Sequence, residues 1–173
     1  ELEAQIAHEG ADTIAAFIGE PLMAAGGVMP PPEGYWPGVE KICRKYDILM
    51  VADEVINGFG RLGSSFGAVH YGFSPDIMVT SKQLTSSYMP LAAIMFPEEV
   101  YNAIADHTHS IGTFGHGFTA SGHPVATAVA LENLKIIEEQ DLIGNAARVG
   151  VGFQAALRAY ADHPLVGEVR GAG

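Results

Sequence analysis

Short apolar runs alternate along this chain with glycine-rich or amphipathic stretches. The runs at 48–53 and 76–82 are rich in β-branched and large apolar side chains, a composition typical of strands that are buried on both faces. Similar runs lie at 13–18 and 90–96. The pattern therefore predicts four strands.

Helical periodicity follows or separates these runs. Residues 35–46 place apolar side chains on one face and charged ones on the other, as an amphipathic helix does. Pro97 followed by two glutamates is a favourable helix start, because proline fits the first turn and acids suit its positive end. Two more helices are expected over 123–139, with Ser121 as the N-cap, and over 142–160. The alternation of strands and helices predicts an α/β fold with a mostly parallel sheet flanked by helices.

Two chemically distinctive side chains follow the two clearest runs. Asp53 ends the first run and Lys82 ends the second. Functional groups collect at the carboxyl ends of parallel strands, so a carboxylate and an amine could hold one flat cofactor between them. The amine would form a Schiff base and the carboxylate would pair with a ring nitrogen, which is the chemistry of pyridoxal phosphate. By position alone, a solvated lysine cap and an aspartate turn cap remain the alternatives.

Three motifs surround these residues. Residues 51–61 read VADEVINGFGR, residues 81–93 read SKQLTSSYMPLAA, and residues 116–124 read HGFTASGHP. Together, in this order and spacing, they resemble the class III pyridoxal-phosphate aminotransferases, and within them the ω-amine:pyruvate branch. The resemblance extends from Gly19 to Gly171.

The resemblance implies a cofactor site. Pyridoxal 5'-phosphate would form a Schiff base with Lys82, which then acts as general base and acid. Asp53 would pair with the ring nitrogen and Val55 would pack against the ring. The matching Phe118-Thr119 pair would reach the cofactor phosphate of the other subunit. An active site shared between subunits of a homodimer is therefore expected.

The resemblance also implies a reaction. Glu20 and Ala25 match positions of the family's substrate pocket. The expected activity is transfer of an amino group from an amine or ω-amino acid to a keto acid, pyruvate being the expected acceptor, by a ping-pong mechanism through a Lys82 aldimine. The alternatives are an aminomutase of the glutamate-1-semialdehyde type, a decarboxylase-like enzyme, and a non-catalytic fragment that keeps the fold. The donor amine stays open.

The extent of the chain gives a further expectation. Family members are far longer, so these residues are expected to be a fragment of a fold type I PLP-transferase. Residues 1–165 would be part of the PLP-binding large domain, and 166–173 the start of the C-terminal small domain. The upstream phosphate loop and the downstream substrate arginine would then lie outside the chain, and poor cofactor binding is expected from the piece alone.

The composition of the chain disfavours several kinds of partner and of structure. A formal net charge of −11 disfavours nucleic acid, since phosphate binding needs clustered lysine and arginine. The single Cys43 excludes an intramolecular disulfide and suits a reducing cytoplasm. No apolar run approaches the roughly 18 residues of a membrane span.

Two patterns imitate other sites. Residues 58–63 satisfy G-x-G-x-x-G, but the following residues predict no helix, so a tight loop is expected rather than a dinucleotide site. No metal is expected at the histidines, which lack a paired carboxylate and helical spacing. The histidines are His107, His109, His116 and His123.

Two further positions carry expectations. Glu54 should point to the face opposite Asp53, where a structural hydrogen bond is expected. Residues 86–88 read Ser-Ser-Tyr, where the commoner sequence in the family is Ser-Gly-Tyr. Ser87 therefore stands at the position of that glycine.

Overall fold

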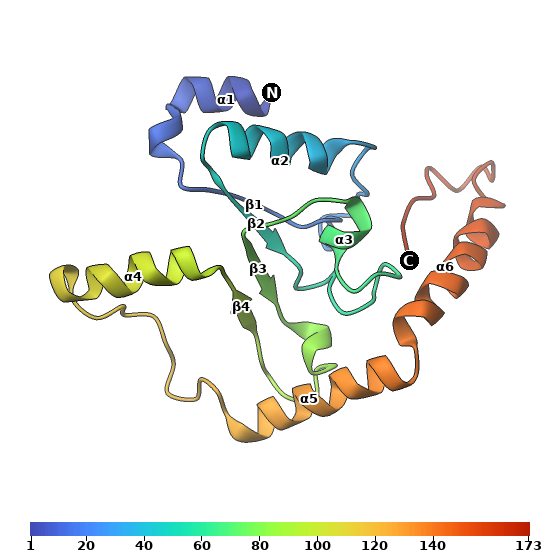
Figure 1. Ribbon diagram of the computed structural model, residues 1–173. Helices are drawn as coiled ribbons and strands as arrows, with labels where there is room; N and C mark the ends of the chain where they lie inside the picture. Colours follow the sequence, from blue (N-terminus) through green and yellow to red (C-terminus); the bar gives the residue numbers. More distant parts are fainter.

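The computed structural model describes residues 1–173, apart from the side chain of Ile111. Its centre is a four-stranded sheet in the order β1-β2-β3-β4 (Figure 1). The strands are β1 (Ala16–Gly19), β2 (Leu49–Asp53), β3 (Ile77–Thr80) and β4 (Ala93–Met95). The first three are parallel, and β4 pairs antiparallel with β3. The predicted α/β fold with a mostly parallel sheet is confirmed.

The strands are shorter than the apolar runs that predicted them. A 3₁₀ turn over Ala11–Thr13 precedes β1, and a second one over Lys82–Leu84 follows β3. The segment from β3 to β4 contains only this 3₁₀ turn and no α-helix, so the chain returns directly and β4 runs antiparallel. Lys82 therefore lies just beyond its strand rather than within it.

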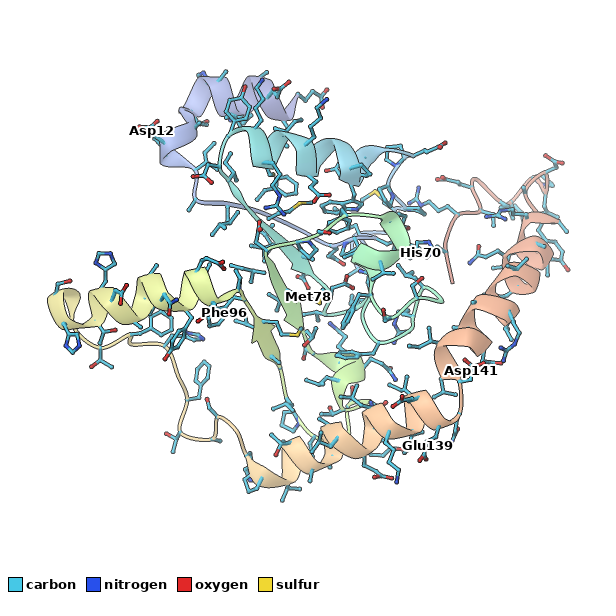
Figure 2. All side chains as sticks on the ribbon, viewed as in Figure 1. Asp12, His70, Met78, Phe96, Glu139 and Asp141 are labelled. Carbon is cyan, nitrogen blue, oxygen red and sulfur yellow. The ribbon has the colours of Figure 1, made fainter. Side chains whose placement is uncertain are left out.

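Helices cover and extend the sheet. They are α1 (Leu2–Glu9), α2 (Tyr35–Lys45), α3 (Gly67–Tyr71), α4 (Glu98–Ile111), α5 (Pro124–Glu139) and α6 (Leu142–Arg158). The four longest were predicted: both ends of α2, α5 and α6 and the start of α4 lie within a few residues of the expected positions. In Figure 1, α1 and α2 lie together above the sheet, whereas α5 and α6 run along its lower and right sides. Asp141 lies at the junction of α5 and α6 (Figure 2).

The core lies between α2 and the sheet. Trp36 and Val39 of α2 are buried together with Met50 and Ala52 of β2. The Trp36 ring stacks on Phe73, with centroids 4.4 Å apart and an interplanar angle of 15°. This packing fixes β2, the strand that ends at Asp53.

Three local predictions were wrong or incomplete. Helix α1 was not predicted, since it buries only Ile6 and offers little apolar periodicity. Helix α3 was not expected either, and the Glu54 carboxylate supplies the acceptors for its first N–H groups. The N-cap of α5 is His123 and not Ser121. Pro124 occupies the first helical position, so the cap falls on the residue directly before it, and the imidazole Nδ1 accepts from the Val125 N–H at 3.2 Å.

The glycine-rich stretch is a loop that packs on α6. Gly60 and Gly63 have φ values of 103° and 76°, which favour glycine. A Cβ on Gly60 would lie 2.8 Å from Ile143 Cγ1, and one on Gly63 would lie 2.8 Å from the Ala147 Cα. No helix opens at these glycines, so the prediction of a tight loop there is confirmed.

Within the residues that the structure describes, none of the helices combines the length and apolarity required to traverse a bilayer.

Candidate active site

The parallel strands bring several predicted residues to one edge of the sheet. Gly19 pairs with Ala52 in register, and Asp53 pairs with Val79. The carboxyl ends of β1, β2 and β3 therefore coincide. Glu20 follows the first of these ends, Asp53 forms the second, and Lys82 follows the third.

Lys82 has an unusual backbone. Its φ is 34°, in the left-handed region that non-glycine residues rarely adopt. Its side chain is exposed, and no ion-pair partner for it occurs among the described residues. A strained backbone persists only where its surroundings hold it, and such residues gather at functional sites.

A pocket of about 310 Å³ adjoins the Lys82 turn. Two hydroxyl groups that line it are engaged with the backbone. Thr85 Oγ1 donates to the Met89 carbonyl at 2.6 Å, and Ser81 Oγ donates to the Leu91 carbonyl at 3.1 Å. These two hydroxyl groups shape the turn, and Lys82 contributes an amine to the lining of the pocket.

Asp53 presents a carboxylate with acceptor capacity to spare. One oxygen accepts from the Val55 N–H at 3.1 Å, and the described residues provide no further donor to this carboxylate. The side chain is half-buried, so a cationic ring N–H placed against it would form a charge-assisted hydrogen bond in partly excluded water. Val55, the next residue on the Asp53 face, is half-buried as well.

Glu54 has a structural role, as predicted. Its side chain is 1% exposed, and its two oxygens accept from the Gly67 and Ala68 N–H groups at 2.9 and 2.7 Å. Burial raises the pKa of the Glu54 carboxyl above its ordinary value, against the opposing effect of the two N–H donors. The adjacent carboxylates of Asp53 and Glu54 thus have separate partners.

The loop after β1 carries Glu20 and Ala25. Glu20 accepts from the Ala24 N–H at 3.1 Å, so its carboxylate first orders its own loop. Ala25 is exposed. Trp36 Nε1 donates to the Pro21 carbonyl at 2.7 Å, which ties the base of the loop to α2.

Three loop-holding residues were missed from the sequence. Asn57 Nδ2 donates to the Leu22 carbonyl at 3.0 Å. Arg170 binds the carbonyls of Gly27 and Val28. Asn133 of α5 binds the Lys82 turn. Only the side-chain type gives a signal for such contacts, because the partners are 35 to 143 positions away.

Phe118 and Thr119 are not brought to Lys82 within one chain. Both are exposed, on the segment between α4 and α5 that runs at the left of Figure 1, away from the turn after β3. The Phe118 N–H is bonded to Ser121 Oγ at 3.1 Å.

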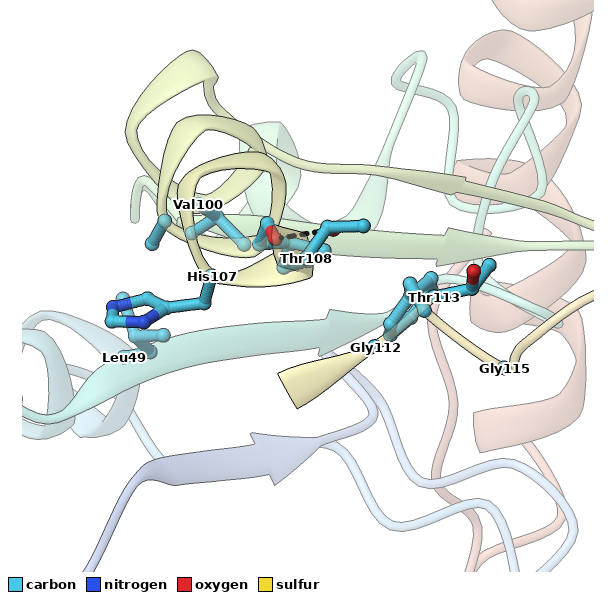
Figure 3. Close-up of a pocket in the computed structure, with 10 residues that line it drawn as sticks. Leu49, Val100, His107, Thr108, Gly112, Thr113 and Gly115 are labelled. Carbon is cyan, nitrogen blue, oxygen red and sulfur yellow. Dashed lines mark hydrogen bonds between the residues drawn. The ribbon is translucent and has the colours of Figure 1, made fainter. Parts of the chain in front are cut away.

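A larger pocket lies elsewhere. It has a volume of about 580 Å³ and lies between Leu49 of β2 and the α4 side chains Val100 and His107 (Figure 3). The Thr108 hydroxyl there is used within α4, donating to the Ile104 carbonyl at 2.9 Å. This pocket contains neither Lys82 nor Asp53.

The side chains at the strand ends fit pyridoxal phosphate in two respects. An unpaired amine follows β3, and a carboxylate with a free acceptor oxygen ends the neighbouring strand β2. The amine suits the carbonyl carbon of the cofactor, and the carboxylate suits its ring nitrogen. For the phosphate, the predicted ligand within these residues is Thr119. No cluster of three His, Cys, Asp or Glu side chains suited to a metal occurs in the described part of the chain.

Comparisons with known proteins agree with this chemistry. The model of the family "Aminotransferase class-III" matches residues 1–173. Diaminobutyrate–2-oxoglutarate transaminase of Halomonas elongata is 49% identical over 174 residues, covering 100% of this chain and 37% of that protein.

Solved structures are also similar. The omega transaminase from Pseudomonas jessenii in complex with PMP gives a TM-score of 0.96 at 61% identity, covering 100% of this chain and 38% of that one. A transaminase with L-alanine gives 0.96 at 60% identity, covering 99% and 41%. The chain thus spans about two fifths of the length of these relatives. Because the family model matches along the whole chain, this chain belongs to the class III aminotransferases.

Proposed function

We propose that this chain forms the cofactor-binding part of a pyridoxal-phosphate-dependent transaminase. The enzyme moves an amino group from an amine or ω-amino acid to a keto acid. The observation that carries the proposal is the placement of Asp53 and the strained Lys82 at adjacent parallel strand ends, with a pocket beside Lys82. In the same proposal, residues 1–165 belong to the large domain and 166–173 begin the small domain.

Each residue has a defined part. Bound pyridoxal phosphate supplies an electron sink for the bonds to the substrate's amine-bearing carbon. The Lys82 amine would hold the cofactor and would serve as the general base for the proton on that carbon. Asp53 holds the proton on the pyridine nitrogen by a charge-assisted hydrogen bond. Val55 packs against the ring, and Glu20 and Ala25 shape the substrate side.

We propose pyruvate as the acceptor. A solved transaminase 60% identical to this chain is in complex with L-alanine, which is the aminated form of pyruvate. The Halomonas relative is instead named for 2-oxoglutarate. Two half-reactions through one modified enzyme give ping-pong kinetics.

The proposal includes a homodimer. Phe118 is 77% exposed, and Thr119 beside it is exposed on a segment that does not reach its own Lys82 turn. A contact with the cofactor phosphate of the partner subunit would bury both. A cytoplasmic location is also proposed, on the basis of the single cysteine; cell fractionation tests it.

The decisive experiment maps the attachment site in the full-length protein that contains this chain. The protein is incubated with pyridoxal phosphate, reduced with borohydride, digested and analysed by mass spectrometry. A pyridoxyl group on Lys82 alone is expected, and Lys82→Ala should lose both the label and turnover. Lys41 provides the matched control, because it is exposed and without an ion pair among the described residues. Label spread over Lys41 and Lys135, or normal turnover by Lys82→Ala, would refute the proposal.

Steady-state kinetics test the reaction class. Parallel double-reciprocal lines with pyruvate support ping-pong transfer, and a comparison with 2-oxoglutarate identifies the acceptor. Conversion of one substrate without any keto acid would indicate an aminomutase. Asp53→Asn should keep cofactor bound but lower kcat by about 100-fold or more, on the scale of other losses of charge stabilisation. An unchanged kcat would remove Asp53 from the mechanism.

A further inference from the structure

The turn that carries Lys82 is strained at several positions. Lys82, Ser86 and Ser87 have φ values of 34°, 48° and 64°. All three lie in the left-handed region, although none is glycine. The two backbone hydrogen bonds that the Lys82 carbonyl accepts are long: the Thr85 and Ser87 nitrogens each lie 3.3 Å from its oxygen. A turn of this kind needs support from outside itself.

Asn133 of α5 supplies that support. Its Nδ2 donates to the Gln83 carbonyl at 2.7 Å and to the Leu84 carbonyl at 3.2 Å. Its Oδ1 accepts from Ser86 Oγ at 2.7 Å. The Gln83 side chain in turn donates to Ser86 Oγ at 3.0 Å. The carboxamide thus uses both amide hydrogens and its oxygen on the turn.

The contact connects the turn to a rigid element. Asn133 lies in the middle of the 16-residue helix α5, whose backbone is held by its own hydrogen bonds. Its partners directly follow Lys82 along the chain, so fixing their carbonyls fixes the direction in which the Lys82 Cα–Cβ bond leaves the backbone. Two of the three bonds go to the backbone, which makes them independent of the side chains at positions 83 and 84.

We propose that Asn133 is a positioning residue for Lys82: it holds the strained turn so that the amine points at the reacting carbon. This inference rests on the proposed function of Lys82. It assigns to α5 a part in aiming the amine, in addition to its packing.

Three variants of the full-length protein separate the contacts. Asn133→Ala removes all of them. Asn133→Asp keeps an acceptor for Ser86 but places a carboxylate oxygen against two carbonyl oxygens, so it should be at least as damaging. Ser86→Ala removes the bond to Asn133 Oδ1 and the bond from Gln83 Nε2, leaves both backbone contacts of Asn133 in place, and should act in the same direction with a smaller effect. Glu132→Gln is the control, because Glu132 is an exposed neighbour on α5 whose carboxylate lies 3.9 Å from Lys135.

Two measurements report on position rather than on folding alone. The first is hydrogen exchange of the peptide covering 82–88 in cofactor-free protein. Loss of these hydrogen bonds should accelerate exchange about tenfold there, with helices distant from the turn unchanged. The second is the pH titration of the absorbance of bound cofactor, whose midpoint depends on how the Lys82 nitrogen sits relative to the ring. A shifted midpoint is expected in Asn133→Ala and not in Glu132→Gln.

Turnover supplies the third measurement. A misplacement of about 1 Å can cost about 100-fold in rate, so Asn133→Ala should lose about that factor in kcat with little change in KM. Suppose that the wild-type protein is labelled at Lys82. If Asn133→Ala then has the same exchange rate, titration midpoint and kcat as the wild type, this inference is overturned and the proposed function is not. A wild-type protein without label at Lys82 overturns the proposed function and this inference with it. If Asn133→Ala does not fold, Ser86→Ala decides by the same measurements.

Discussion

Among single residues, Ser87 has a strained backbone. Its φ of 64° is a conformation that glycine adopts without strain. The turn therefore contains backbone strain at a position where the family commonly has glycine. Its neighbour Ser86 has a φ of 48°, but its hydroxyl is bonded to Asn133.

Replacing Ser87 by glycine should stabilise the protein. Relief of the left-handed strain, offset in part by the greater freedom of glycine in the unfolded chain, should raise the free energy of unfolding by about 0.5–1 kcal/mol. Urea titration of both proteins measures the change. Ser86→Gly is the matched control and should bring no gain, because it loses the bond to Asn133. Equal gains at both positions would contradict this account.

Glu54 makes a prediction about pH. Burial raises the pKa of its carboxyl above 4.5 in the folded protein. Between pH 4.5 and the raised pKa, the folded state keeps a proton that the unfolded state has released. The contribution of Glu54 to the free energy of unfolding of the protein therefore decreases as the pH rises through this interval.

Glu54→Gln tests that prediction. The variant should be less stable, because one N–H group at the start of α3 loses its acceptor, and it should lack the Glu54 part of the pH dependence. Urea titrations from pH 4.5 upward give the difference between the two proteins. A difference that does not change with pH would show that Glu54 does not titrate in this interval.

At the scale of elements, the loop between β1 and α2 depends on a distant arginine. Arg170 Nε donates to the Val28 carbonyl and Nη2 to the Gly27 carbonyl, both at 2.8 Å. Val28 has a φ of 50°, so the loop is strained where the guanidinium binds it. The loop also carries Ala25, a predicted substrate-pocket residue.

Arg170→Ala should loosen this loop. Exchange of the amides over 23–29 should accelerate about tenfold, since hydrogen bonds to charged donors are among the stronger ones. Arg170→Lys should rescue little, because an ammonium lacks the planar fork of guanidinium. Arg158→Ala serves as control, since the Arg158 guanidinium makes no hydrogen bond or ion pair with the described residues. Unchanged exchange in Arg170→Ala would show that the loop holds itself.

The sequence predicted the strands better than it predicted the turns. The apolar runs located β1 to β4, and the alternation of elements predicted their mostly parallel order. The runs overestimated strand length, because apolar side chains continue into turns such as the one at Lys82. Helix α3 was missed, because the carboxylate that caps it comes from Glu54, 13 residues earlier.

At the scale of the whole molecule, large apolar side chains are exposed on the α4–α5 segment. Phe114 is 57% and Phe118 77% exposed. Exposed apolar groups that gather in this way mark surfaces that other protein covers. The proposed homodimer gives them a partner and brings Thr119 to a second active site.

Mixed dimers test this arrangement. Lys82→Ala lacks the amine, and Thr119→Asp should repel the cofactor phosphate, so each alone should be inactive. Coexpression should restore about a quarter of wild-type activity per subunit, since half of the dimers are mixed and each has one intact site. A mixture as inactive as its parents would show that Thr119 does not act across subunits.

The α/β class, the four strands, the four longest helices and the choice of Asp53 and Lys82 as candidate residues could be predicted from the sequence alone. These features follow from local patterns, because burial sets the apolar period and a strand end sets the position of the next residue. The side chains that hold the Lys82 turn and the loop after β1 were identified only from the folded structure. The contacts of Asn133 with the Lys82 turn, and of Arg170 with Gly27, join residues about 50 and 143 positions apart. Hydrogen bonds over such separations depend on how helices and loops pack, and a local pattern does not encode that packing.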